Sequence, residues 1–345
     1  NQIKGNMNEI SSEKNKLETI LLHLADGVLA FNLKGNLIHA NLAAKKMLNV
    51  KDEKTFEAIF SKLKIDINLE KIIYLDDWTS SEQMVNIGDK FFNIFFAPFR
   101  DESNRASGVV AVIQDMTEQA KLDDMRKEFV ANVSHELKTP LQSIIGRAEL
   151  IENGIVRPDD LKSFGLKIRT EGQALLNMIN DIMFLSKVES GVKAQKEQIN
   201  IKTLVDSVAD SLKDKAQKKQ VSIQVNCKEA SFLFVRSYMS EILYNLIDNG
   251  IKYNKEGGKV ECNISTNNQN LYISIKDNGI GIPSEDLGRI FERFFCVDRS
   301  HSNKDSTGLG LTIVKHIIEE CNGHINVDSK LNVGTTFSIT LPIEQ

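Results

Sequence analysis

The chain has 345 residues, 26% of them charged and 41% hydrophobic, which at about 150 residues per domain predicts two or three domains with sizeable cores. Lysine and arginine number 43 against 47 aspartates and glutamates, and the net charge of −4 argues against a strongly basic nucleic-acid-binding protein. The sequence contains no apolar stretch of the roughly 18 residues that a membrane span requires. Four widely spaced cysteines exclude a zinc knuckle and a small disulfide framework, so free thiols are predicted.

The first residues differ in character from those that follow. Residues 1–16 are polar and charged, and an amphipathic run begins at Leu17. We expect residues 1–16 to be the end of a linker helix that enters from an upstream segment, so that the chain starts inside a larger protein.

Residues 17–117 alternate between short apolar runs and turn signals. Strands are expected over residues 27–31, 37–40, 91–97 and 108–114. The turn signal Lys34-Gly35-Asn36 separates the first two strands, and Asn41 is a suitable N-cap for a helix that ends near Leu48. This order of elements, together with the string DGVLAFNLKGNLIHANLAA, resembles a PAS domain, a small α/β sensor fold.

Two helical patterns with an apolar repeat of seven residues follow between residues 118 and 191. The repeats comprise Val130, Leu137, Ile144 and Ile151 in the first helix and Leu161, Ile168, Leu175 and Ile182 in the second. Asn153-Gly154 and Pro158 mark the connection, which predicts a helical hairpin. Because one hairpin cannot cover both of its apolar stripes, we expect a homodimer in which two hairpins form a four-helix bundle.

From residue 192 onward, helices mix with strands that are expected to pair mainly antiparallel. Helices are expected near residues 202–219, 238–253 and 309–321, and strands near residues 221–225, 232–235, 259–265, 271–276, 325–329 and 335–341. These elements predict an α/β two-layer sandwich over residues 192–345. The predicted fold class is therefore a multidomain α+β protein.

His135 in the string SHELKTP is the first candidate for chemistry. It follows the seam position Ser134 by one residue and should face solvent, and Pro140 removes a helical hydrogen bond nearby. An imidazole is partly neutral and nucleophilic at pH 7. The carboxylate of Glu136 can hold one tautomer of the ring and accept the proton that is lost on attack.

Three clusters of amides and glycines form the second candidate. Asn245 and Asn249 share a helix face, and their amide oxygens suit a hard cation such as Mg²⁺. The string DNGIGIP starts at Asp277, whose carboxylate can accept a hydrogen bond from an adenine amino group. The segment Thr307-Gly308-Leu309-Gly310 opens a helix whose N-terminal amides can hold phosphate. Each cluster alone is a weak indication, but their order and spacing together predict a nucleotide site.

The two candidates together resemble the sensor histidine kinases of two-component systems. FVANVSHELKTPL is similar to the H-box of this family, NLIDNGIKYN to the N-box, DNGIGIP to the G1 box, IFERFF to the F-box and STGLGL to the G2 box. The resemblance covers about Lys121 to Pro342, and the chain is similar to the cytoplasmic part of the WalK/PhoR group of Gram-positive sensors. It implies a last domain with the fold of the gyrase, Hsp90 and histidine kinase ATPases.

The resemblance also implies a role for each motif residue. His135 would accept a phosphoryl group from ATP with Glu136 as its acid–base partner, and Thr139 would position water for phosphatase action. Asn249 would hold Mg²⁺. The nucleotide-binding residues would be Asn245, Asn249, Lys252, Tyr253, Asp277, Gly279, Gly281, Thr307, Gly308, Leu309 and Gly310.

Partners and location follow from the same resemblance. The phosphoryl group would pass to an aspartate on the receiver domain of a separate response regulator. The chain would be cytoplasmic as given and membrane-attached through segments outside it, and it would bind no nucleic acid. The expected domains are an upstream linker over residues 1–16, a PAS sensor over 17–117, a signalling helix with the dimerisation and phosphotransfer hairpin over 118–191, and a catalytic ATP-binding domain over 192–345.

The sequence departs from the family pattern at two positions. Gly250 stands in the N-box where alanine is more common, at a cost of roughly 1 kcal/mol in helix stability. Ser306 stands where a glycine is frequent, at the end of residues 296–306, which the resemblance assigns to a mobile lid.

A ligand site in the expected PAS domain has little support in the sequence. His23 and His39 could ligate haem, and Trp78 or the phenylalanines of residues 91–99 could line an aromatic pocket. Core packing and surface positions explain these side chains better. No cysteine lies in residues 1–120, which argues against a flavin-adduct photosensor.

Two other classes of protein share parts of this pattern. A clamp of the same ATPase fold hydrolyses ATP to drive closure, but it needs no histidine on a hairpin. A scaffold that binds partners without catalysis needs no set of nucleotide motifs. The sequence decides neither the signal nor the partner regulator, nor whether His135 is phosphorylated in cis or in trans.

Overall fold

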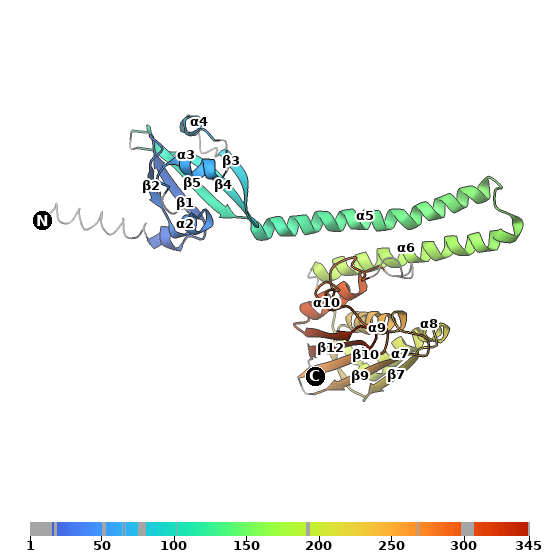
Figure 1. Cartoon of the computed structure of the whole chain (residues 1–345). Helices are drawn as coiled ribbons and strands as arrows, with labels where there is room; N and C mark the ends of the chain where they lie inside the picture. Colours follow the sequence, from blue (N-terminus) through green and yellow to red (C-terminus); the bar gives the residue numbers. More distant parts are fainter. Residues whose placement is uncertain are drawn as a thin grey trace. The chain divides into compact units, whose positions relative to one another are not determined.

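A computed structural model describes the chain over residues 16, 19–49, 53–63, 65, 67–74, 81–101, 103–190, 194–267, 269–297 and 307–343. The chain divides into two compact units, Asn1–Glu128 and Phe129–Gln345 (Figure 1). Apart from Lys16, the expected linker helix lies outside the described residues, and so do Trp78 and residues 298–306 of the expected lid.

The first unit is built on a five-stranded antiparallel sheet with the strand order β2-β1-β5-β4-β3. Its strands are β1 (Gly27–Asn32), β2 (Leu37–Ala40), β3 (Ser81–Ile87), β4 (Lys90–Arg100) and β5 (Ala106–Asp115), and its short helices are α2 (Leu42–Met47), α3 (Phe56–Lys62) and α4 (Leu69–Ile73). The four strands and the helix expected in this region are confirmed. The sequence did not indicate β3 because this edge strand is largely exposed and carries no apolar run.

Phenylalanine rings fill the core between this sheet and its helices. Phe31 on β1, Phe56 and Phe60 on α3, and Phe96 on β4 are completely or almost completely buried. Their ring centroids lie 4.6 to 5.9 Å apart, mostly in edge or tilted contacts. These aromatic side chains therefore pack the core, as the sequence favoured.

Asn41 is the predicted N-cap of α2, and it also ties this helix to β1. Its Oδ1 accepts hydrogen bonds from the N–H groups of Ala44 and Val28, each at 2.9 Å. Its Nδ2 donates to the carbonyls of Asp26 and Leu21. The side chain is almost fully buried, and these four bonds satisfy it.

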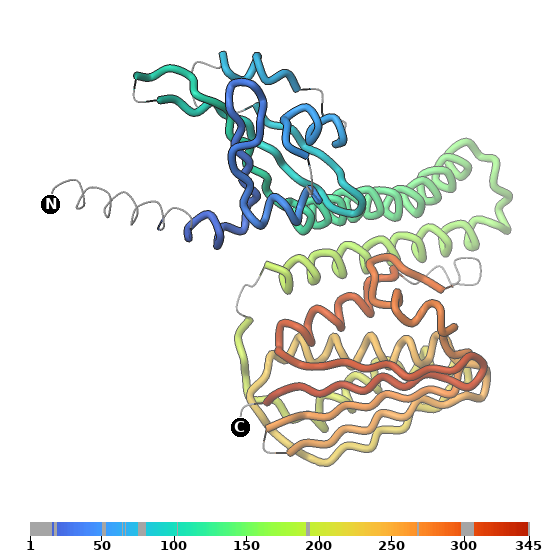
Figure 2. The backbone as a smooth tube through the Cα atoms, turned by 60° about the vertical axis from the view of Figure 1, so that its left-hand side comes forward, coloured from blue at the N-terminus to red at the C-terminus, as the bar shows by residue number. Residues whose placement is uncertain are grey.

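Two long helices form a hairpin in the second unit. They are α5 (Thr117–Glu152), which continues from the first unit, and α6 (Leu161–Glu189), with the short 3-10 helix η1 (Pro158–Asp160) before α6. The arms run antiparallel (Figures 1 and 2), and Arg147 Nη1 on α5 lies 4.0 Å from Glu171 Oε1 on α6. The connection predicted at Asn153-Gly154 and Pro158 is confirmed.

The remainder of the second unit is an α/β two-layer sandwich. Its sheet has the strand order β11-β12-β10-β9-β7, in which β7 is parallel to β9 and the other neighbours are antiparallel. The sheet consists of β7 (Ser222–Cys227), β9 (Lys259–Thr266), β10 (Asn270–Asp277), β11 (His324–Lys330) and β12 (Gly334–Pro342). The helices are α7 (Ile201–Ser211), α8 (Lys213–Lys218), α9 (Arg236–Lys252) and α10 (Gly310–Glu320), and β6 (Glu197–Asn200) pairs with β8 (Ser231–Phe234) separately.

The helices α9 and α10 cover one face of this sheet, and α10 also contacts α6 (Figure 2). Buried aliphatic side chains fill the space between the two layers, among them Ile242, Leu246, Ile273 and Ile313. The multidomain α+β fold predicted from the sequence is confirmed, including the two-layer sandwich.

The helix expected over residues 202–219 is in fact two helices that meet at Leu212. This residue is completely buried, and its N–H is bonded to the carbonyls of Val208 and Ala209. The sequence did not reveal the break, because Leu212 also fits the apolar period of a continuous helix.

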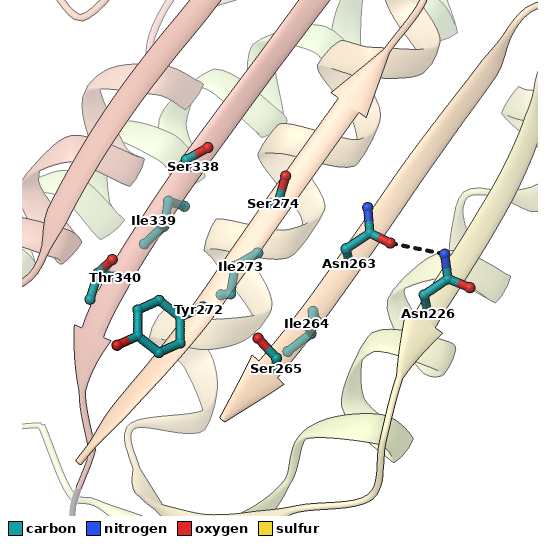
Figure 3. A pocket seen from close by; sticks show the side chains of 10 residues that line it. All are labelled: Asn226, Asn263, Ile264, Ser265, Tyr272, Ile273, Ser274, Ser338, Ile339 and Thr340. Atoms are coloured by element: carbon teal, nitrogen blue, oxygen red, sulfur yellow. Dashed lines mark hydrogen bonds between the residues drawn. The ribbon is translucent and has the colours of Figure 1, made fainter. Parts of the chain in front are cut away.

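The other face of the sheet is polar and carries a shallow pocket of about 310 Å³ (Figure 3). Its lining comes from the neighbouring strands β7, β9, β10 and β12, and Asn226 Nδ2 donates a hydrogen bond to Asn263 Oδ1 at 2.9 Å. The lining includes no residue of the predicted nucleotide motifs. The candidate site therefore lies on the helical side of the sandwich.

Within the described ranges, none of the helices combines the length and apolar character needed to cross a lipid bilayer. All four cysteines are free, as predicted. Burial raises the pKa of the Cys262 thiol to about 12, so it is an inert core residue at neutral pH.

Candidate functional site

His135 lies on α5 with its side chain open to solvent. The side chain is 78% exposed, as its position next to the helix seam predicted. Glu136 Oε1 lies 3.7 Å from His135 Nδ1. The carboxylate therefore lies beside the Nδ1 side of the imidazole ring.

Thr139 lies one helical turn after His135, and its hydroxyl is engaged locally. Thr139 Oγ1 donates a hydrogen bond to the His135 carbonyl at 3.2 Å. The next residue, Pro140, has no N–H, and α5 nevertheless continues through it to Glu152. A hydrogen bond to the backbone is therefore one function of the Thr139 hydroxyl, and it does not require that Thr139 positions water.

The nucleotide motifs gather around a pocket of about 280 Å³ between α6, α8, α9 and the start of α10. Seven predicted residues line it, namely Asn245, Asn249, Lys252, Tyr253, Thr307, Gly308 and Gly310. The structure brings these residues together although they come from two segments more than 50 residues apart in the chain. Leu309, also predicted, is completely buried in the hydrophobic core.

The amide of Asn245 has a defined orientation in this pocket. Its Nδ2 donates to the carbonyl of Glu241 at 3.0 Å and to Glu241 Oε1 at 2.9 Å. Its Oδ1 points at Gly310, where an added Cβ would lie 2.4 Å from this oxygen. Gly310 is therefore required for the close approach of α9 and α10.

The loop before α10 is held against the F-box segment. Gly308 has φ +68, and an added Cβ there would lie 2.7 Å from the Cα of Phe294. Phe294 N donates to the Gly308 carbonyl at 3.0 Å, and Thr312 Oγ1 donates to the Phe291 carbonyl at 3.0 Å. These contacts place the N-terminus of α10, where backbone N–H groups favour anions, at the pocket.

Asp277, Gly279 and Gly281 are not part of the pocket lining. Asp277 Oδ1 accepts from the N–H of Gly279 at 2.8 Å and from the N–H of Thr335 at 3.4 Å. Burial raises the pKa of Asp277, and these two bonds partly oppose that effect. An added Cβ on Gly279 would lie 2.3 Å from the Tyr253 carbonyl, so the Asp277 turn packs directly on a pocket residue.

Glu241 is a pocket residue that the sequence analysis missed. It lies four residues before Asn245 on α9, and this spacing could have indicated it, because residues at i and i+4 share a helix face. Burial, together with the charge of Asp181, raises the pKa of Glu241. Two carboxyl groups thus lie in the part of the pocket next to α10.

The hairpin helix α6 contributes three further lining residues, Asn177, Asn180 and Asp181. Asp181 Oδ2 accepts a hydrogen bond from Thr307 Oγ1 at 2.9 Å, and burial raises the pKa of Asp181. No sequence pattern could have indicated them, because this contact joins segments more than 100 residues apart.

A second contact holds the end of α6 to the sandwich. Glu189 Oε1 accepts from Arg293 Nη2 and lies 3.1 Å from His316 Nε2. The Arg293 guanidinium stacks over the ring of Phe129, 4.6 Å from its centroid. His135 is not among the residues that line the pocket.

Gly250, where the sequence departs from the family pattern, lies in the interior of α9 and is buried. An added Cβ would lie 3.0 and 3.2 Å from the two γ-carbons of Val260. Glycine at this position therefore makes room for Val260 in the core, and its helix cost is offset by that packing.

A hairpin that presents a histidine and a sandwich that binds nucleotide define the core of a protein-histidine kinase. Residues 125–191 match the family described as the His Kinase A (phospho-acceptor) domain, and residues 235–345 match the histidine kinase-, DNA gyrase B-, and HSP90-like ATPase. The sensor histidine kinase WalK of Bacillus subtilis (strain 168) is 33% identical over 347 residues. The chain belongs to the sensor histidine kinases of two-component systems, as the sequence motifs predicted.

Solved structures agree with this family. The Acinetobacter baumannii histidine kinase AdeS is 26% identical, with a TM-score of 0.52 over 61% of this chain and 98% of AdeS. Histidine kinase ThkA, solved in complex with the response regulator protein TrrA, shares the fold at 22% identity and a TM-score of 0.50, covering 94% of this chain and 97% of ThkA. The match to WalK covers 96% of this chain and 56% of WalK, so the chain spans about half the length of this relative.

Proposed function

We propose that this chain transfers the γ-phosphoryl group of ATP to His135 and then to an aspartate of a separate response regulator. The observation that carries the proposal is the presence, in one chain, of an exposed histidine beside a carboxylate and of a pocket built from amides, glycines and a helix N-terminus. A clamp ATPase would use the pocket alone, and a scaffold would use neither.

In the proposed transfer step, the two ring nitrogens of His135 and the carboxylate of Glu136 have different roles. With Glu136 near Nδ1, Nε2 attacks the γ-phosphorus, a nitrogen–phosphorus bond forms, and the bond from this phosphorus to the bridging oxygen of ADP breaks. The proton on Nδ1 is drawn toward the Glu136 carboxylate, which offsets the positive charge that develops on the ring. Positioning and electrostatics supply most of the catalysis in phosphoryl transfer.

The pocket residues hold the nucleotide. Asp277 accepts a hydrogen bond from the adenine amino group, and the Tyr253 ring packs near the base. Lys252 and the N–H groups at the start of α10 meet the phosphates, for which Gly308 and Gly310 leave the backbone accessible. Leu309 keeps this segment in register by its burial in the core.

Magnesium fits the donors that are present. Asn249 and Asn245 line the pocket and provide amide oxygens, which are suitable ligands for a hard cation that retains several waters. We assign Asn249 as the protein ligand, with Asn245 beside it. Bound Mg²⁺ would neutralise charge on the β- and γ-phosphates.

A homodimer through the hairpin is part of the proposal. No residue of α5 is buried within this chain, and α6 buries just Met178, Leu185 and Val188. Large apolar side chains of both helices stay open to solvent, including Leu141, Ile145, Leu166 and Leu176. Pairing of two hairpins would cover them.

The regulator's receiver domain would dock at His135, since ThkA was solved with a response regulator protein. Thr139 lies one turn away on the same helix face and would position water to remove the phosphoryl group from the regulator. We also propose that residues 17–117 are a PAS sensor domain, with the hairpin over 118–191 and the ATP-binding domain over 192–345. Attachment to a membrane would come from segments outside this chain.

The chemical stability of the product tests this function. After incubation with γ-labelled ATP and Mg²⁺, the label on the protein should be lost in acid and retained in alkali, as expected for a phosphoramidate. Addition of the receiver domain should move the label to that domain. Release of free phosphate without a labelled protein would favour the clamp ATPase, and no turnover with intact partner binding would favour the scaffold.

A further inference from the structure

Glu241 and Asn245 form a pair on α9 whose chemistry determines which atom of Asn245 faces the pocket. Asn245 Nδ2 donates two hydrogen bonds, to the Glu241 carbonyl at 3.0 Å and to Glu241 Oε1 at 2.9 Å. A carboxylate and a peptide carbonyl accept hydrogen bonds and donate none. The NH₂ group of Asn245 must therefore lie on the Glu241 side.

The opposite side of the same amide faces the start of α10. Asn245 Oδ1 would be 2.4 Å from a Cβ added to Gly310, so this oxygen lies against the first residue of α10. Gly310 and Asn249 line the same pocket. An amide rotated by half a turn would present hydrogens here in place of the oxygen, and hydrogens repel a cation.

The surroundings of Glu241 indicate that it has a function other than ion pairing. It is half-buried, and in the part of the chain that the structure describes no lysine or arginine forms a salt bridge with it. The like charge of Asp181 adds to the effect of burial in raising the pKa of Glu241. A carboxyl group in such a place lowers stability unless its hydrogen bond is useful elsewhere.

We propose that Glu241 is a positioning residue for the nucleotide-bound cation, because it orients the Asn245 amide so that Oδ1 faces the pocket beside Asn249. The inference rests on the proposed magnesium site. In other metal sites, residues that hydrogen-bond to a metal ligand hold that ligand in the right orientation, and Glu241 would do the same for Asn245. Substitution of such residues typically lowers metal affinity about 10- to 100-fold.

Three variants of the full chain separate this role from a merely structural one. Glu241→Gln keeps an acceptor oxygen for Asn245. Glu241→Met has a similar length but accepts no comparable hydrogen bond. The double variant Glu241→Met with Asn245→Asp presents an oxygen to the pocket whichever way the side chain turns, so it no longer needs an orienting partner.

The readout is ADP binding by calorimetry over a range of Mg²⁺ concentrations, which requires no catalysis. Glu241→Met should raise the Mg²⁺ concentration for half-maximal tightening about tenfold, and this change should exceed any change in its ADP affinity without Mg²⁺. Glu241→Gln should stay within about threefold of the original protein, and the double variant should recover most of the loss.

Some results would contradict the positioning role of Glu241, and a different result would contradict the cation site itself. An unchanged Mg²⁺ dependence in Glu241→Met, an equal loss in Glu241→Gln, or no recovery in the double variant would overturn the positioning role. If the unsubstituted chain itself binds ADP equally with and without Mg²⁺, the proposed cation site is wrong and this inference falls with it. Should Glu241→Met fail to fold, Glu241→Ala, which also removes the acceptor oxygen, is compared with Glu241→Gln in its place, and an equal Mg²⁺ dependence of these two variants would overturn the positioning role.

Discussion

Several side chains with predicted chemistry are held by local hydrogen bonds, and these bonds determine which of their atoms remain for a ligand. Asp277 uses Oδ1 for the N–H groups of Gly279 and Thr335. Asn245 uses its NH₂ group for Glu241. The motif strings predicted seven of the residues that line the pocket. The orientation of an amide depends on partners outside the motif, which a string does not reveal.

Asp277→Asn should weaken nucleotide binding by about 1.5 to 3 kcal/mol, roughly 10- to 150-fold in Kd. The oxygen of an asparagine at this position stays with the N–H groups of Gly279 and Thr335, so its NH₂ group would turn toward the adenine amino group. Two donors would then face each other. Calorimetry with ATP measures the effect, and an unchanged Kd with an intact fold would count against adenine recognition by this residue.

Thr139→Ala should lower phosphatase activity toward the phosphorylated regulator at least tenfold and leave autophosphorylation within about twofold, because His135 and Glu136 are untouched. Loss of the 3.2 Å bond to the His135 carbonyl affects just the local backbone. Thr139→Ser retains the hydroxyl and is the matched control.

The measurement is loss of label from the regulator in the presence of ADP. Equal losses of both activities, or a normal dephosphorylation rate in Thr139→Ala, would leave Thr139 with its backbone contact as its sole role.

At the scale of elements, the spacing of apolar residues predicted the helices and strands whose formation depends on local sequence. The hairpin, helix α9 and most strands lie where the apolar spacing predicted them. The break at Leu212, the edge strand β3 and the pairing of β6 with β8 were missed, because each depends on burial or pairing between distant segments. The contact of α6 with the pocket was missed for the same reason.

Asp181→Asn should stabilise the protein against unfolding at neutral pH. The pKa of Asp181 is raised by burial, so folding binds protons, and the stability associated with this group falls as pH rises above the ordinary aspartate range. Asparagine keeps an acceptor for Thr307 and removes the buried charge. The gain in melting temperature should be largest near pH 7.5 and shrink as pH falls toward 4. A gain that is independent of pH would contradict this account.

At the scale of the whole molecule, the structure separates His135 from the proposed nucleotide pocket. Asp181 of α6 accepts a hydrogen bond from Thr307, just before α10, while His135 lies outside the pocket lining. The proposed transfer therefore requires the hairpin and the sandwich to change position, or requires His135 of a second chain. The sequence predicted both reacting parts, but their mutual position depends on tertiary contacts that no motif encodes.

The chain should be a dimer at micromolar concentration, because Leu141 is 46% exposed and Leu166 is 54% exposed on the two arms of the hairpin. Burying such side chains is worth about 25 cal/mol for each Å² of apolar surface. Light scattering measures the mass in solution. Glutamate at Leu166 should produce monomers, glutamate at the exposed surface position Lys162 should not, and a monomeric unsubstituted chain would refute the bundle.

The most direct test of phosphoryl transfer to His135 is labelling of the His135→Gln variant beside the unsubstituted chain. Both are incubated with γ-labelled ATP and Mg²⁺, and ATP affinity is measured in parallel. We predict that the unsubstituted chain acquires an acid-labile label, whereas His135→Gln acquires none and binds ATP with the same Kd within about twofold, because His135 does not line the pocket. Labelling of His135→Gln at the original rate would contradict the assignment of His135 as the phosphoacceptor.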